Sequence, residues 1–313
     1  MSSTLILDHD QTRRALPPDA LLPAVRTALI ATSRNEASTP PRIAAIAPAG
    51  ILGAMPGYVA GLGLAGKFVA IFRPGGPTGP STHHGIVALF DENDGHVLAL
   101  MSGEAVTAAR TAASATVAFQ ELAPSTVGRI AVIGAGVQAH AQLELLHHLG
   151  LTAEIVVASR SQDSATHLAQ RYGTATARTI QEAVCSADVV FCCTDADHPV
   201  LRHPWLRSPA HISSVGGSRG HELDRSTVTG GTLYVEWPGA VSHAPPAGAH
   251  ELQDVSPDRA ALLGSVLSGD HPGRTGDELT VFKSTGYAAL DVAAASVAYQ
   301  RATELGFGTR IDM

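Results

Sequence analysis

The fold is decided by the stretch Gly128-Arg129-Ile130-Ala131-Val132-Ile133-Gly134-Ala135-Gly136-Val137-Gln138-Ala139. Its first half is apolar and β-branched and has the length of a buried parallel strand, and the glycines that follow form a turn. A helical pattern from His140 to Leu149 and a second apolar run, Glu154 to Ser159, complete a βαβ unit. In such a unit the first glycine permits a tight turn, the second lets the backbone approach a pyrophosphate, and the small third residue allows close helix packing. The stretch therefore predicts a dinucleotide site at the helix N-terminus.

The end of the second strand indicates which dinucleotide binds. An acid that holds the ribose 2′-hydroxyl is expected about 20 residues after the glycines, but the chain there reads Ala158-Ser159-Arg160-Ser161. A guanidinium with two hydroxyls suits a 2′-phosphate, so NADP(H) is favoured, with NAD(H) as the alternative. Two other interpretations stay open: Arg160 as an ordinary surface cation, and Asp163 as the residue that reaches a ribose.

The composition argues against several classes of protein. The 313 residues suffice for about two domains, and 45% hydrophobic with 16% charged residues is typical of a globular chain. A formal net charge of −7 without a Lys/Arg cluster argues against a nucleic-acid partner. The chain begins without a basic apolar leader and has no run of about 18 apolar residues, so we expect no membrane association and a cytoplasmic location. Cys185, Cys192 and Cys193 lack metal-site spacing and are interpreted as core thiols.

The part of the chain before the βαβ unit predicts a helix followed by a sheet. Residues 19–34 carry apolar side chains at helical spacing, with Asp19 as N-cap. No helical pattern separates the next apolar runs, so they indicate an antiparallel or mixed sheet, and Asn93-Asp94-Gly95 is a hairpin signal. These runs are Ile43–Ala47, Ile51–Met55, Lys67–Phe72, Ile86–Phe90 and His96–Met101. A helix from Glu104 to about Leu122 follows.

After the βαβ unit, strands and helices alternate as in a doubly wound sheet. We predict helices at 161–172, 180–186, 258–267 and 287–305, and strands near 175–178, 188–193, 211–215 and 232–236. The predicted fold class is α/β. It combines a Rossmann-type doubly wound parallel-sheet domain, residues 123–286, with a smaller α+β domain, residues 1–122 with 287–313.

Three cations stand in unusual surroundings: Arg42 follows two prolines, Lys67 opens an apolar strand, and Arg110 lies on an alanine-lined helix face. A buried arginine is costly without an anionic partner. One interpretation is an internal salt bridge of Arg110, with Glu104, Asp91 or Glu222 as its partner. The other is a substrate carboxylate held bidentately by arginines, with Lys67 able to shift its pKa for proton transfer.

At this point the residues resemble the ornithine cyclodeaminase/μ-crystallin family, over nearly the whole chain. The resemblance rests most on Arg110-Thr111-Ala112-Ala113 and on the glycine turn with Gln138-Ala139. The other matching motifs are Met55-Pro56, Gly66-Lys67, Cys193-Thr194 with Pro199-Val200, Val215-Gly216, Glu222-Leu223-Asp224, and Phe282-Lys283-Ser284-Thr285-Gly286 through Asp291.

The resemblance implies a homodimer in which the domain of residues 1–122 and 287–313 binds substrate and mediates dimerisation. It implies that Arg42, Lys67 and Arg110 hold the carboxylate of a small amino or imino acid. Lys67 and Arg110 are the catalytic candidates, and Met55, His83 and Ser218 complete the substrate candidates. The cofactor candidates from motif and resemblance are Thr111, Gly134, Gly136, Val137, Gln138, Ser159, Arg160, Ser161, Cys193, Thr194, Val215, Gly216, Lys283 and Gly286.

One departure from the family pattern bears on mechanism. The cyclodeaminases of the family carry a catalytic Asp where this chain has Ser218, and serine cannot act as a carboxylate base. We therefore expect an NAD(P)H-dependent reductase of a small α-imino or α-keto acid, in which Lys67, His83 or His84 protonates nitrogen. The alternatives are a redox-neutral cyclodeaminase in which Glu222 or His221 replaces the Asp, and a protein that binds NADPH and a small ligand without turnover.

Overall fold

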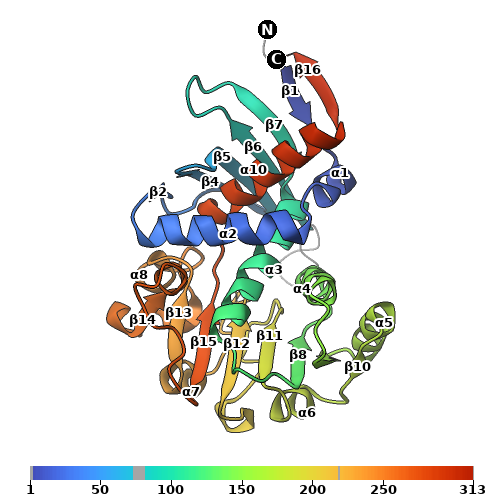
Figure 1. Ribbon diagram of the computed structural model, residues 1–313, viewed down its shortest axis with the longest axis vertical. Coiled ribbons are helices and arrows are strands. Elements are labelled where there is room, and N and C mark those ends of the chain that lie inside the picture. Colours follow the sequence, from blue (N-terminus) through green and yellow to red (C-terminus); the bar gives the residue numbers. More distant parts are fainter. Residues whose placement is uncertain (1–2, 73–81, 218, 313) are drawn as a thin grey trace. The chain divides into compact units, whose positions relative to one another are not determined.

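The computed structural model describes residues 3–72, 82–217 and 219–312 (Figure 1). The chain divides into two compact units, residues 1–110 with 287–313 and residues 111–286. We call them the mixed-sheet unit and the parallel-sheet unit. The division falls inside helix α3 (Gly103–Leu122), not at its end as in the sequence-based range. The reason is that the second half of α3 bonds to the parallel-sheet unit: the Ala115 and Leu122 carbonyls accept hydrogen bonds from Ser213 and Thr280.

The mixed-sheet unit is built on one sheet with the order β16-β1-β7-β6-β5-β4-β2, and β3 pairs with β4. Neighbouring strands are antiparallel except β1 and β7, which are parallel, so the expected mixed sheet is confirmed. The strands are β1 (Ser3–Ile6), β2 (Ala37–Ser38), β3 (Ile43–Ala47), β4 (Gly50–Val59), β5 (Gly63–Phe72), β6 (Thr82–Phe90), β7 (Val97–Ser102) and β16 (Thr309–Asp312). The terminal strands β1 and β16 were not predicted.

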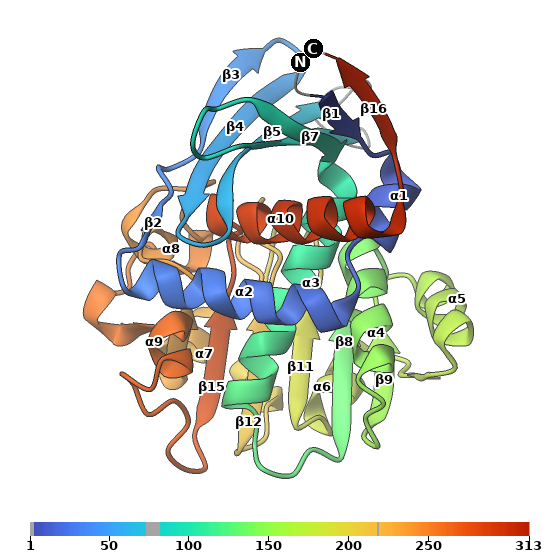
Figure 2. The same cartoon turned by 45° about the horizontal axis from the view of Figure 1, so that its top comes forward.

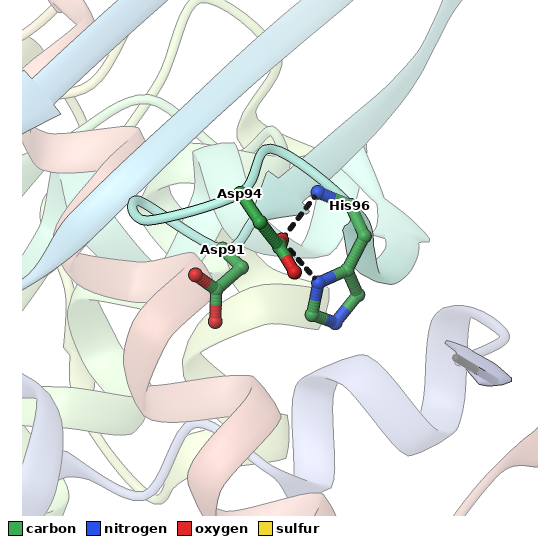
Figure 3. Close-up of side chains that lie close together, drawn as sticks. All are labelled: Asp91, Asp94 and His96. Atoms are coloured by element: carbon green, nitrogen blue, oxygen red, sulfur yellow. Dashed lines mark hydrogen bonds and ion pairs between the residues drawn. The ribbon is translucent and has the colours of Figure 1, made fainter. Parts of the chain in front are cut away.

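The turn between β6 and β7 carries the expected hairpin signal, and its polar side chains close it (Figure 3). Asp91 accepts a hydrogen bond from the Asn93 N–H at 2.8 Å, and Asp94 accepts one from the His96 N–H at 3.0 Å. These backbone N–H bonds lower the pKa of Asp91 and of Asp94. Gly95 has φ +76°, which completes the reversal. The bonds give the Asp91, Asp94 and His96 cluster a structural role in the turn.

The helices of this unit are α1 (His9–Arg14), α2 (Pro18–Ser33) and α10 (Ala288–Leu305), with the first part of α3. Figure 2 shows α2 and α10 side by side, and α10 also packs on β4 and β5. Covered on both sides, α10 is buried around most of its circumference, which explains its alanine-rich sequence. It ends at Gly306 with φ +69°, as predicted. The N-cap prediction for α2 was wrong: Pro17 is the N-cap, and Asp19 lies in the first turn.

The parallel-sheet unit has the strand order β10-β9-β8-β11-β12-β15-β13-β14, parallel throughout. The order runs outward in both directions from β8, so it reverses between β8 and β11, the switch point at which doubly wound sheets bind ligands. The strands are β8 (Arg129–Ile133), β9 (Glu154–Ala158), β10 (Ala175–Thr176), β11 (Val189–Cys192), β12 (Ala210–Ser214), β13 (Thr232–Val235), β14 (Ala260–Leu262) and β15 (Leu279–Lys283). The predicted Rossmann-type fold is confirmed.

Helices cover this sheet, and apolar residues of β8, β9, β11 and α4 form its core, Ile130, Val132, Leu143, Val157 and Phe191 among them. The helices are α4 (Val137–His148), α5 (Gln162–Tyr172), α6 (Ile180–Cys185), α7 (Arg225–Gly230), α8 (Gly239–Ser242) and α9 (Leu263–Leu267). The prediction of one helix over 258–267 was wrong, since a 3₁₀ turn (Pro257–Arg259) and β14 precede α9. Cys192 and Cys193 are buried, but Cys185 is exposed, against the expectation of three core thiols. No helix in the described ranges is long and apolar enough to cross a membrane.

Candidate active site

The glycine turn after β8 adopts a conformation that only glycine allows at its first position. Gly134 has φ +117°, and a Cβ there would lie 2.4 Å from the Cys193 carbonyl oxygen. The Gly134 N–H donates to the Ala158 carbonyl at 2.8 Å, which ties the turn to the end of β9. The backbone is therefore drawn tightly against β9 and β11 at the switch point.

The second glycine leaves space at the start of α4. A Cβ on Gly136 would meet no atom within 4 Å, and this residue is the N-cap of α4 without a side-chain cap. The first N–H groups of a helix need acceptors, and an uncapped helix end with open space before it suits an anion. The strained first glycine and the open second glycine thus fit a dinucleotide pyrophosphate.

A cleft of about 520 Å³ opens beside this turn. Seven of the fourteen predicted cofactor residues line it: Gly134, Gly136, Ser159, Arg160, Ser161, Cys193 and Thr194. The sequence reasoning missed seven further lining residues: Ile133, Ala135, Ser164, Ile180, Asp195, Ala196 and Val200. Three of these, Ile133, Ala135 and Asp195, directly flank a predicted residue, whereas Ile180 enters from a separate helix and has no sequence signal.

The end of β9 presents Arg160 to the cleft as an exposed side chain. In the ranges that the structure describes, its guanidinium makes no hydrogen bond or ion pair. Ser161 is the N-cap of α5 and accepts a hydrogen bond from the Ser164 N–H at 3.2 Å. Asp163 is exposed in the first turn of α5 and does not line the cleft. Arg160 is thus available for an anion, as the 2′-phosphate interpretation requires.

The remaining cofactor candidates lie outside the cleft lining. Thr111 is buried in α3, and Val137 and Gln138 belong to the first turn of α4. Val215 follows β12 and donates its N–H to the Cys192 carbonyl at 3.0 Å. Gly286 donates its N–H to buried Glu236, which also accepts from the Thr285 N–H and the Ser284 hydroxyl.

Lys283 belongs to a buried ionic network in the parallel-sheet unit. Its ammonium lies 2.9 Å from a Glu251 oxygen and donates to Ser214 Oγ and to the Gly216 carbonyl, each at 2.8 Å. Glu222 accepts from the Thr194 N–H and hydroxyl with one oxygen, and from Ser214 and the Gly216 N–H with the other. Burial raises the pKa of Glu222, and Lys283 and these hydrogen bonds oppose that rise. Glu222, the predicted substitute base, therefore ties the ends of β11 and β12 together, while His221 is exposed.

In the mixed-sheet unit, two of the three predicted cations meet on one carboxylate. Lys67 on β5 lies 2.8 Å from Asp291 Oδ2, and Arg110 Nε on α3 lies 3.2 Å from Asp291 Oδ1. The side chains of Lys67, Arg110 and Asp291 are 4%, 7% and 2% exposed, so all three charges are withdrawn from water. The partner of Arg110 is Asp291, and the predicted partners Glu104, Asp91 and Glu222 were wrong.

The charges around Lys67 set its pKa. Burial lowers the pKa of Lys67 from 10.5 to about 8, the Asp291 carboxylate opposes this, and Arg110 and Arg42 lower it further. Arg42, which is half-buried, therefore acts on the same ammonium. Met55 lies opposite Lys67 in the β4–β5 register and is also buried. All three predicted carboxylate-binding cations are thus electrostatically coupled.

The other substrate candidates are not part of this cluster. His83 and His84 are exposed on β6, and His84 Nδ1 lies 3.2 Å from a Glu104 carboxylate oxygen at the surface. Ser218 lies outside the described residues. Of the proposed proton donors that the structure describes, Lys67 alone is buried beside the paired arginine.

The sheet order and the glycine turn at its switch point define a dinucleotide-binding protein of the Rossmann type. A family model described as the ornithine cyclodeaminase/mu-crystallin family matches residues 3–306, and the chain belongs to that family. Ketimine reductase mu-crystallin of Mus musculus is 34% identical over 258 residues, which cover 80% of each chain. The solved structure of Thermococcus litoralis Δ1-pyrroline-2-carboxylate reductase, in complex with NADH and L-proline, has a TM-score of 0.87 at 27% identity, covering 98% of this chain and 100% of that one. An archaeal alanine dehydrogenase dimer with bound NAD has a TM-score of 0.84 at 28% identity, with 100% of both chains covered.

Proposed function

We propose that the protein is an NAD(P)H-dependent reductase of a small α-imino or α-keto acid, of the cyclic ketimine reductase or amino-acid dehydrogenase type. The observation that carries the proposal is the buried pair Lys67 and Arg110, because among the described residues these two cations share one carboxylate, Asp291. The excess positive charge favours a bound anion, and the substrate carboxylate is the natural candidate. Two of the relatives named above are named for small acids, Δ1-pyrroline-2-carboxylate and alanine, and the first of them holds L-proline.

The proposed roles follow from the donors. Arg110 and Arg42 bind the carboxylate, which fixes the neighbouring C=N group in one orientation. The glycine turn and the first N–H groups of α4 hold the pyrophosphate. The nicotinamide, when bound, supplies a hydride to the imine carbon. Lys67 Nζ gives its proton to the imine nitrogen as the carbon accepts the hydride, and the neutral amine of Lys67 then takes a proton from water.

A turnover screen tests this function against its alternatives. Purified protein is supplied with cyclic ketimine carboxylates, or with keto acids plus ammonia or methylamine, and the oxidation of NADPH and NADH is followed by absorbance. Steady oxidation with at least one acid is expected. Ammonia release from ornithine or lysine without net cofactor change would instead make the protein a cyclodeaminase. Tight NADPH binding without turnover of any of these compounds would make it a binding protein.

We further propose that NADP(H) is preferred over NAD(H), because Arg160 lines the cleft without a partner among the described residues. In Arg160→Ala we expect KM for NADPH to rise about tenfold, since a charge-assisted contact with phosphate is lost, while KM for NADH stays near the wild-type value. Arg171→Ala is the matched control, because Arg171 stands over the Tyr172 ring on α5 and does not line the cleft. Equal effects of Arg160→Ala on both cofactors would contradict the preference.

We also propose that the protein is a cytoplasmic homodimer. One face of the mixed sheet carries exposed apolar side chains on three neighbouring strands: Leu52 and Tyr58 on β4, Phe68 on β5 and Ile86 on β6. Ile43 on β3 extends the same row, because it is paired with Ala54, which in turn faces Phe68. A contiguous apolar patch of this kind is typical of an interface with a second copy. The three unpaired cysteines suit a reducing compartment.

A further inference from the structure

Asp291 stands between the two catalytic candidates and contacts both. Its Oδ1 accepts from Lys67 Nζ at 2.9 Å and from Arg110 Nε at 3.2 Å, and its Oδ2 lies 2.8 Å from Lys67 Nζ. Asp291 is 1% exposed as a residue. A carboxylate in this position fixes the ammonium and the guanidinium relative to each other through one rigid group.

Asp291 uses only one of the three guanidinium nitrogens of Arg110. Arg110 is bound through Nε, and its two Nη groups make no hydrogen bond to any residue that the structure describes. Those groups form the fork that matches a carboxylate bidentately. Lys67 Nζ also donates a long hydrogen bond, 3.3 Å, to Thr107 Oγ1. Asp291 therefore engages Arg110 through Nε alone and leaves both Nη groups of Arg110 for a ligand.

The fold holds Asp291 in place through the start of α10. Asp291 lies in the first turn of this helix, where the helix dipole favours a negative charge. On β4, a Cβ at Gly57 would come within 2.7 Å of the Ala288 Cβ, so strand and helix approach closely. This close approach sets the position of the first turn of α10 over Lys67, which lies on the neighbouring strand β5.

We propose that Asp291 is a positioning residue for the reaction: it orients the Arg110 fork toward the substrate carboxylate and holds Lys67 in its protonated form as proton donor. This inference rests on the proposed function. The charged groups that face Lys67 are Asp291 from α10, Arg110 from α3 and Arg42 from the segment before β3. Two of the three are cations, so without Asp291 the ammonium would stand among like charges and would release its proton at lower pH.

The first test compares Asp291→Asn, Asp291→Glu and the wild type with the best imino acid. Because asparagine keeps the shape and loses the charge, we expect kcat/KM to fall about 100-fold, a loss typical of misplaced catalytic groups. We also expect the basic limb of the pH profile of kcat/KM, where activity falls as pH rises, to lie at lower pH in Asp291→Asn than in the wild type. Asp291→Glu restores the charge at a shifted position, so we expect the basic limb to return while KM stays raised. Glu304→Gln, an exposed change on the same helix, is the control and should match the wild type.

The second test does not depend on turnover. The protonation of Lys67 is followed as a function of pH by NMR, from the ¹³C shift of its Cε in protein grown with labelled lysine. The chain has two lysines, Lys67 and Lys283, so Lys67→Arg assigns the signal. Circular dichroism checks the folding of each variant. We expect the midpoint of the Lys67 titration at lower pH in Asp291→Asn than in the wild type, and an unchanged midpoint in Asp291→Glu. If Asp291→Asn does not fold, Asp291→Glu decides alone, and a wild-type KM in that variant overturns the inference.

The two tests separate failure of this inference from failure of the proposed function. A wild type that reduces no imino or keto acid overturns the proposed function and, with it, the positioning role in catalysis. The inference alone is overturned if the wild type is active, the KM of Asp291→Asn lies within about twofold of the wild-type value, and its kcat/KM falls at the same basic pH. An unchanged midpoint of the Lys67 titration in folded Asp291→Asn also overturns it.

Discussion

At the scale of single residues, the buried charges of the mixed-sheet unit carry most of the functional information. An arginine on an alanine-lined helix face predicted an anionic partner, and the structure supplies one. The identity of that partner was missed because Asp291 is 181 residues away from Arg110 in the chain. The same signal was present at Asp291, since an acid surrounded by alanines and leucine in a buried helix also needs a counter-charge. Charged residues in apolar helices are therefore best considered as pairs.

The pKa of Lys67 gives a testable pH dependence. Below about pH 8 the ammonium is protonated and can donate, and above that pH the donor is progressively lost. We therefore predict that kcat/KM for an imino acid falls about tenfold per pH unit on the basic side of this pKa. Steady-state measurement of kcat/KM for the wild type as a function of pH tests this prediction.

The matched variant for this profile is Lys67→Arg, which keeps a positive charge that does not titrate in this range. We expect it to bind the acid with a similar KM and to lose most of kcat, because a guanidinium is a poor proton donor. Full activity in Lys67→Arg would assign the proton transfer to another group.

At the scale of elements, local patterns predicted what local contacts determine. The strand, glycine turn and helix from Arg129 to His148 follow one another without interruption, so their sequence pattern was sufficient. The strand β15 was missed because its five residues include Thr280 and Lys283, whose buried polar groups bond to Leu122 and Ser214, far away in the chain. The terminal strands β1 and β16 pair with each other from opposite ends of the chain, and no local pattern reports such a pairing.

The glycine turn allows two neighbouring substitutions to separate folding from cofactor binding. Gly134→Ala places a side chain at φ +117° and against the Cys193 carbonyl. We expect it to lower the free energy of unfolding by about 1–3 kcal/mol, the usual cost of a strained backbone position. Gly136→Ala meets no atom within 4 Å in the protein and has φ −93°.

For Gly136→Ala we therefore expect a loss of about 1 kcal/mol or less in unfolding, together with a Kd for NADPH raised at least about tenfold, because its methyl group fills the approach to the pyrophosphate. Urea unfolding and fluorescence titration with NADPH measure the two effects. Unimpaired NADPH binding in Gly136→Ala would contradict the proposed position of the pyrophosphate.

At the scale of the whole molecule, the mixed-sheet unit is assembled from both ends of the chain. The final helix α10 supplies Asp291 to a cluster whose cations come from residues before 111, so this cluster is complete only when the chain returns to its first unit. Composition and periodicity predicted the helix itself, and the family resemblance predicted that it belongs to the same domain as the N-terminal part of the chain. The acid within α10 that pairs with these cations could not be predicted from the sequence, because nothing in the spacing of Lys67, Arg110 and Asp291 relates them.

The exposed apolar row of the mixed sheet leads to a prediction about assembly. Phe68 is 45% exposed at the middle of the row and lies opposite Ile86, which is 52% exposed. We predict that the wild type is a dimer and that Phe68→Asp weakens association at least about 30-fold, since a buried interface charge costs at least as much as loss of a central apolar anchor. Ile46→Asp is the matched control: Ile46 is 87% exposed, but it lies three residues from Ile43 on β3 and so points to the opposite face. Sedimentation equilibrium over a range of concentrations measures both constants. Equal weakening by the two substitutions, or a monomeric wild type, would remove this face as the interface.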